Sequence, residues 1–294
     1  MIKAVLAAGA LLLGTVNRGS LVTETTATAG SALPREVTIV GLDYAFQAPR
    51  ELPAGPTTFR FDNKGKVRHE FNIALLKPGA KIDDLIALRK QGKSTLSLLE
   101  GPVGVLFAAP GGRSSVGLTT DLIPGRDYAV ICIFRDTATA PRHLEMGMYS
   151  VIHVAPGVSA TNSGDIPTHF ITGLDYAFKA PATIPSGRRW LAFENQGKVA
   201  HEVAIALLRQ GVTIDSVLKV EKAGGEVDGM FEPGESGLLH SQAGQKALGR
   251  LDVDFLPGRV YSIVCFFQDS AKAPPHVALG MVGSIQVNGV AADR

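Results

Sequence analysis

Residues 261–287 read YSIVCFFQDSAKAPPHVALGMVGSIQV, and they carry a cysteine, a histidine and a methionine in a fixed order. Cys265 lies in an apolar, β-branched run that is typical of a buried strand. A polar, proline-containing loop follows and reaches His276, and Gly280-Met281 opens a second apolar run. The pattern predicts a strand, a long loop and a returning strand that crowd the three side chains together.

An earlier stretch has the same design. Tyr128 begins an apolar run that contains Cys132, and His143 and Met148 follow before the run that ends at Val154. Thiolate, imidazole and thioether are the soft donors that copper prefers in proteins. The two stretches therefore predict two copper sites, each completed by a second histidine from elsewhere in the chain.

The rest of the chain repeats with nearly the same period. The segment Gly41-Leu-Asp-Tyr-Ala-Phe46 recurs at residues 173–178, and Asn63-Lys-Gly-Lys-Val-Arg-His69 recurs as Asn195-Gln-Gly-Lys-Val-Ala-His201. These motifs are offset by 132 residues, whereas the cysteine, histidine and methionine are offset by 133. Such a small drift over a whole repeat indicates two copies of one fold.

The N-terminus has the pattern of a secretory signal at residues 1–29. Lys3 precedes a short apolar run, and Ala27-Thr-Ala29 offers a small-residue cleavage site. The run is too short to span a bilayer, so no stable membrane span is expected after signal removal. We predict an exported protein, periplasmic or secreted, with domains at residues 36–155 and 168–289 and a linker at 156–167.

Each copy is predicted to be mostly strands. Residues 37–42, 57–62 and 68–76 have strand patterns, whereas 82–89 and 214–220 have apolar positions at helical spacing. Seven or so strands with one short helix in about 120 residues predict a Greek-key β-sandwich. The expected fold class is all-β, with two tandem sandwiches that each carry a short helical insertion. Tyr and Phe two residues apart, at Tyr44 and Phe46, are expected to face the same core.

The motif order resembles that of the cupredoxin family, the plastocyanin and azurin group of blue copper proteins. The shared features are Asn-x-Gly-x-x-x-His on an early strand, Tyr-x-x-x-Cys near the end, and His-x4-Met before the last strand. The resemblance covers nearly all of both repeats and implies one copper per domain. The implied ligands are His69, Cys132, His143 and Met148 in the first domain, and His201, Cys265, His276 and Met281 in the second.

The spacing between cysteine and second histidine departs from the family. Only a few residues separate them in blue copper proteins, but ten intervene in each copy here, at 133–142 and 266–275. Asp136 and Asp269 are expected to stiffen these loops. A loop ordered across the ligands favours copper, whereas a loop splayed outward favours a metal-free interaction module in the periplasm or at the cell surface.

The remaining sequence signals narrow the function. The net charge is only +2 and no basic block stands out, so no nucleic acid partner is expected. No His-x-His pair occurs, and His153, His169 and His240 have no counterpart in the other copy and are expected at the surface or at edges. No second copper centre of an oxidase or reductase is therefore predicted, and the protein is not expected to be an enzyme.

We expect an exported tandem cupredoxin-like protein that binds copper for electron transfer or copper carriage. A redox or copper-delivery protein would be its partner. A disulfide between Cys132 and Cys265 is not expected, because it would have to join the interiors of two domains.

Overall fold

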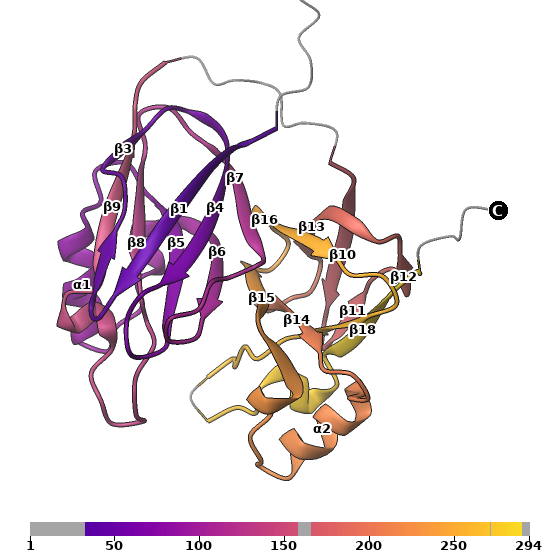
Figure 1. Cartoon of the computed structure of the whole chain (residues 1–294). Helices are drawn as coiled ribbons and strands as arrows, with labels where there is room; N and C mark the ends of the chain where they lie inside the picture. Colours follow the sequence, from indigo (N-terminus) through magenta and orange to yellow (C-terminus); the bar gives the residue numbers. More distant parts are fainter. Residues whose placement is uncertain (1–32, 158–165, 271, 290–294) are drawn as a thin grey trace, which may run out of the picture. The chain divides into compact units, whose positions relative to one another are not determined.

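The computed structural model describes residues 33–157, 166–270 and 272–289, which belong to one compact unit (Figure 1). The predicted signal at residues 1–29 and most of the predicted linker lie outside the described residues. Within the described part, no helix combines the length and the apolar character of a membrane span.

The first repeat follows a strand-rich order with one α-helix. Its elements are β1 (Arg35–Leu42), β2 (Ala45–Gln47), β3 (Glu51–Leu52), β4 (Gly55–Asn63), β5 (His69–Leu76), α1 (Ile82–Lys90), the 3-10 helix η1 (Leu96–Leu98), β6 (Leu99–Ala108), β7 (Gly117–Leu122), β8 (Asp127–Ile131), the 3-10 helix η2 (His143–Met146) and β9 (Tyr149–Val154).

The second repeat has the same order. Its elements are β10 (Thr168–Leu174), β11 (Ala177–Lys179), β12 (Thr183–Ile184), β13 (Gly187–Asn195), β14 (His201–Leu208), α2 (Ile214–Lys222), η3 (Asp228–Met230), β15 (Phe231–Ser241), β16 (Lys246–Phe255), β17 (Val260–Val264), η4 (His276–Leu279) and β18 (Val282–Val287).

Both predicted helices are present and are stabilised locally. In α1, acidic residues occupy the first turn and basic residues the last, which complements the helix dipole. In α2, the Thr213 side chain accepts a hydrogen bond from the Ser216 N–H and caps the first turn. Nine strands per repeat exceed the expected seven, because short edge segments such as β2 and β3 also pair.

The strands form two sheets that enclose an apolar core. Along β5, Phe71, Ile73 and Leu75 alternate into this core, whereas Leu76 on the other face is buried in a second apolar cluster with Leu85 of α1. The rings of Phe59 and Phe61 pack against Phe71, with centroids 5.4 and 6.1 Å apart. The predicted all-β sandwich is confirmed.

Each sheet continues from one repeat into the other. Strand β6 pairs antiparallel with β15, and β7 pairs antiparallel with β16. The result is one sheet of eight strands, ordered β11-β10-β13-β16-β7-β4-β1-β2, and one of ten, ordered β12-β18-β17-β14-β15-β6-β5-β8-β9-β3. Backbone hydrogen bonds thus join the repeats, and the residue limits of the two domains stay a prediction.

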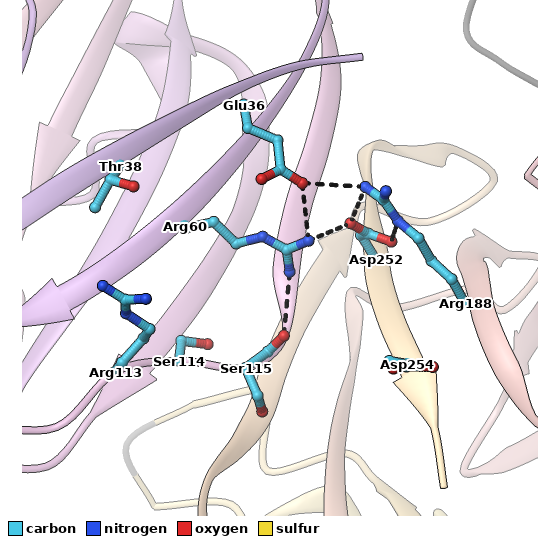
Figure 2. A pocket seen from close by; sticks show the side chains of 9 residues that line it. All are labelled: Glu36, Thr38, Arg60, Arg113, Ser114, Ser115, Arg188, Asp252 and Asp254. Carbon is cyan, nitrogen blue, oxygen red and sulfur yellow. Dashed lines mark hydrogen bonds and ion pairs between the residues drawn. The ribbon is translucent and has the colours of Figure 1, made fainter. Parts of the chain in front are cut away.

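A charged cluster lies beside the β7–β16 junction (Figure 2). The Asp252 carboxylate is 1% exposed and accepts two hydrogen bonds from Arg188, at 2.8 and 2.7 Å, and one from Arg60 of the first repeat at 2.8 Å. Glu36 accepts from both arginines at 3.2 and 3.3 Å. Two guanidinium groups and two carboxylates therefore balance one another where the repeats meet.

Candidate metal centre

Three side chains of the first repeat converge at one end of the sandwich. His69 begins β5, Cys132 directly follows β8, and His143 begins η2, and all three are 0% exposed. The two imidazole Nδ1 atoms lie 2.9 Å apart, and Cys132 Sγ lies 3.4 Å from His143 Nδ1 and 4.0 Å from His69 Nδ1. The structure therefore brings together three of the four predicted ligands of this repeat around one point.

The second repeat reproduces this arrangement. His201 Nδ1 lies 2.9 Å from His276 Nδ1, which lies 3.5 Å from Cys265 Sγ. These three side chains are also 0% exposed. In each repeat the nearest donor atoms of the three residues fall within 4.8 Å of one another, close enough for one ion to contact all of them.

The ten-residue loop of the first repeat folds back across the cluster. The His143 N–H donates to the Phe134 carbonyl at 3.0 Å, and the Leu144 N–H donates to the Cys132 carbonyl at 2.8 Å. The Met148 N–H donates to the His143 carbonyl at 2.9 Å, and the Cys132 N–H donates to the Met148 carbonyl at 3.2 Å. These bonds hold both ends of the loop, so its extra length does not separate the histidine from the cysteine.

The two predicted axial methionines are buried beside their clusters. Met148 and Met281 are 0% exposed, and each shares backbone hydrogen bonds with the cysteine of its repeat and with the histidine that follows the long loop, His143 or His276. We call this second histidine the outer histidine of its cluster. A Cβ atom at Gly41 would lie 3.4 Å from Met148 Cε, and one at Gly173 would lie 3.4 Å from Met281 Cε. The methionines thus pack against the first strand of each repeat, and their role as ligands stays a prediction.

Burial keeps the cysteine thiol of each cluster neutral. Burial raises the pKa of the Cys132 thiol to about 12, and it does the same for Cys265. Burial also lowers the pKa of His69, and the neighbouring His143 adds to this effect. A thiolate in this buried cluster therefore requires a bound cation, which is the condition for a soft metal site.

A buried glutamate links the histidine strand to the cysteine strand, and sequence reasoning missed this role. The Glu70 carboxylate accepts a hydrogen bond from the Ile133 N–H at 2.8 Å, and the Glu70 N–H donates to Cys132 Sγ at 3.5 Å. Burial raises the pKa of Glu70 to about 7. Glu202 makes the equivalent bonds in the second repeat. The repeated His-Glu pair was the available signal.

Tyr44 does not share the core with Phe46, so that prediction is wrong. Phe46 packs against the core ring of Phe61, but Tyr44 has a left-handed backbone, with φ 63°, in the turn between β1 and β2. This turn breaks the strand alternation and places the Tyr44 ring edge-on to His143, with centroids 5.0 Å apart. The Tyr44 hydroxyl donates to Asp136 Oδ2 at 3.0 Å.

The three unmatched histidines lie in different surroundings. His153 is half-exposed and bonds Asp127 at 2.7 Å, as expected for a residue near the surface, and His169 is half-buried. The prediction is wrong for His240, because β15 lies inside the ten-stranded sheet. The His240 ring packs against Phe267, and burial lowers its pKa to about 4.

Comparison with known proteins adds structural neighbours. No family model matches the sequence, and no curated protein matches it. Reduced auracyanin from Roseiflexus castenholzii is 20% identical over 42% of this chain and 100% of its own, with a TM-score of 0.30. Auracyanin A, a "blue" copper protein from Chloroflexus aurantiacus, is 21% identical over 41% and 98%, with a TM-score of 0.29. The chain has a cupredoxin-like fold. The blue copper oxidase from Nitrosomonas europaea is 11% identical over 86% of each chain, with a TM-score of 0.24.

The prediction that this cupredoxin-like protein is not an enzyme is wrong. Solved structures that match across both repeats include a multicopper oxidase and a blue copper oxidase, and oxidases are enzymes. The prediction rested on the missing His-x-His pairs. A missing sequence pattern does not exclude catalysis on a fold of two cupredoxin-like repeats.

Proposed function

We propose that the protein binds one copper ion in each repeat and transfers electrons. The observation that carries this proposal is the convergence, twice in one chain, of two imidazole Nδ1 atoms and one thiol Sγ in a fully buried cluster. Two nitrogens and one sulfur with a nearby methionine form the donor set of electron-transfer copper sites. The proposed ligands are His69, Cys132, His143 and Met148 in the first repeat, and His201, Cys265, His276 and Met281 in the second.

The surroundings suit electron transfer better than metal carriage. Copper would supply the one-electron redox chemistry. The chain's own residues would hold the donors in place, because backbone bonds tie Cys132, His143 and Met148 to one another. The Phe134 ring packs against His143, with centroids 5.6 Å apart, and helps to exclude water. A carrier would need to release its metal, and fully buried ligands held on both sides oppose release.

The cellular setting is part of the same proposal. Residues 1–29 would direct export to the periplasm or beyond, and a redox protein would be the partner that delivers or accepts the electron. An oxidising compartment also makes the burial of the two thiols useful, because burial protects them when no metal is bound.

Copper titration tests the proposal. The purified protein with copper(II) should develop intense thiolate-to-copper absorption in the visible, saturating near two copper ions per chain. Cys132→Ser and Cys265→Ser should each remove about half of the absorption, and together all of it. His153→Ala, at a half-exposed histidine outside the clusters, should change nothing. Absence of both colour and copper uptake in the reduced protein would overturn the proposed function.

A further inference from the structure

The outer histidine of each cluster is held from behind by an aspartate of the long loop. His143 directs Nδ1 toward the cluster, and its Nε2 lies 3.1 Å from Asp136 Oδ1. The second repeat has the same contact at 3.2 Å, between His276 and Asp269. The imidazoles are 0% exposed, whereas the aspartates are about one-third exposed. Sequence spacing gave no reason to connect the aspartate with the imidazole beyond a general stiffening of the loop.

This contact fixes the position of the imidazole proton. An ionised carboxylate can only accept hydrogen bonds, so His143 Nε2 must be the protonated nitrogen. With its proton held on Nε2, the ring presents the lone pair of Nδ1 to the cluster. In the metal-free protein this lone pair accepts a hydrogen bond from His69 Nδ1, 2.9 Å away.

The two imidazoles of a cluster are therefore not equivalent. His143 already has the tautomer that a metal requires. His69 carries its proton on Nδ1 in the metal-free protein, because this nitrogen must donate to His143 Nδ1, while its Nε2 has no hydrogen-bond partner. Metal binding would move that proton to Nε2, where Asp43 Oδ1 is the nearby acceptor at 3.8 Å.

A tyrosine anchors each aspartate. The Tyr44 hydroxyl donates to Asp136 Oδ2 at 3.0 Å, which leaves Oδ1 for His143, and the Tyr176 hydroxyl donates to Asp269 Oδ2 at 3.1 Å. Both tyrosines have positive φ, at 63° and 60°. Residues other than glycine rarely adopt this backbone conformation. Its occurrence at the same place in both repeats indicates that the contacts of the tyrosine side chain maintain it.

We propose that Asp136 and Asp269 are positioning residues. Anchored by Tyr44 and Tyr176, they preset the outer imidazole of each site in the tautomer that binds metal through Nδ1. Their negative charge also makes that imidazole a stronger electron-pair donor to the metal. The inference rests on the proposed copper function for its consequence, but the tautomer itself is a property of the metal-free protein.

Nitrogen NMR of the imidazoles in the metal-free, full-length chain tests the tautomer directly. Wild-type His143 should carry its proton on Nε2. Asp136→Ala should give a mixture of tautomers at His143, while Asp136→Asn should retain the wild-type tautomer because its amide oxygen still accepts. His276 should be unchanged in both variants and serves as the internal control for folding. An unaltered His143 tautomer in Asp136→Ala would overturn the inference.

Copper measurements in a Cys265→Ser background isolate the first site and test the consequence. Asp136→Ala should weaken copper(II) affinity about 10- to 100-fold. Asp136→Asn should raise the reduction potential, because a carboxylate behind the imidazole stabilises the higher copper charge. Tyr44→Phe should change the copper affinity and the reduction potential in the same directions as the aspartate variants, but by less. Unchanged affinity and potential in both aspartate variants would overturn the inference. Failure of the parent protein to bind copper would instead overturn the proposed function, and the NMR result would still stand.

Discussion

The buried Glu70 carboxyl should make the metal-free protein less stable as pH rises. Burial raises its pKa from the ordinary 4.5 to about 7, partly offset by the hydrogen bond from the Ile133 N–H. Between these pH values the native state keeps a proton that the unfolded state has lost. The contribution of Glu70 to the free energy of unfolding is therefore fully present below pH 4.5 and is lost by about pH 7. At about 1.4 kcal/mol per pKa unit, the loss amounts to about 3 kcal/mol.

Glu70→Gln isolates this effect, because glutamine keeps an oxygen for the Ile133 N–H and cannot ionise. Urea unfolding of the metal-free protein should show the variant about 3 kcal/mol more stable than wild type at pH 8, with a smaller difference at pH 4.5. Glu226→Gln, at an exposed glutamate, should follow the wild-type pH profile. If Glu70→Gln loses as much stability between pH 4.5 and pH 8 as wild type does, the reasoning from burial is refuted.

Three further predictions follow from the same contacts. Because burial raises the pKa of the Cys132 thiol to about 12, copper must displace the thiol proton, so copper affinity should rise about tenfold per pH unit from pH 7 to 9. Calorimetry in buffers of different ionisation enthalpy should detect the released proton, and binding without proton release would contradict the prediction. Gly65→Ala would place Cβ 2.8 Å from His69 Nε2 and should lower copper affinity at the first site by about tenfold, whereas unchanged affinity would show that the ring can move freely. Asp252→Ala removes the buried partner of Arg60 and Arg188 and leaves them only their contacts to the exposed Glu36, so it should cost about 2–3 kcal/mol in urea unfolding, against little for the exposed Asp254→Ala; equal costs would exclude a stabilising role for the cluster.

Much of the fold could be predicted because it depends on local signals. The apolar alternation along each strand and the helical spacing at residues 82–89 and 214–220 are properties of short segments. Because the motifs recur after 132 residues, a fold predicted for one repeat also applies to the other. The helices, the sandwich and the convergence of histidine and cysteine all follow from these patterns.

The junction between the repeats could not be predicted in the same way. The pairing of β6 with β15 and of β7 with β16 joins strands that are far apart in the chain. Any edge strand carries unpaired backbone groups, and its own sequence does not determine which other strand will pair with it. The Asp252–Arg60 contact has the same origin, since it links residues that only the junction brings together.

The roles of Glu70 and Tyr44 escaped prediction for a different reason. A glutamate next to a histidine on a strand is ordinarily a solvent-facing residue, and the burial of Glu70 beside Ile133 is a tertiary contact that its own segment does not indicate. Tyr44 leaves the core because one positive φ in the turn reverses the side to which its ring points. In both cases a residue read as part of a strand pattern is used instead to hold the cluster.

We propose that each repeat holds copper through one cysteine sulfur and two histidine nitrogens. X-ray absorption of the copper-loaded protein measures these bonds. We expect two coppers per chain, each with one short copper–sulfur bond and two copper–nitrogen bonds, and loss of the short sulfur bond at both sites in Cys132→Ser/Cys265→Ser. Copper that shows no sulfur neighbour in the wild-type protein, or an unchanged spectrum in that double variant, would contradict the proposed coordination.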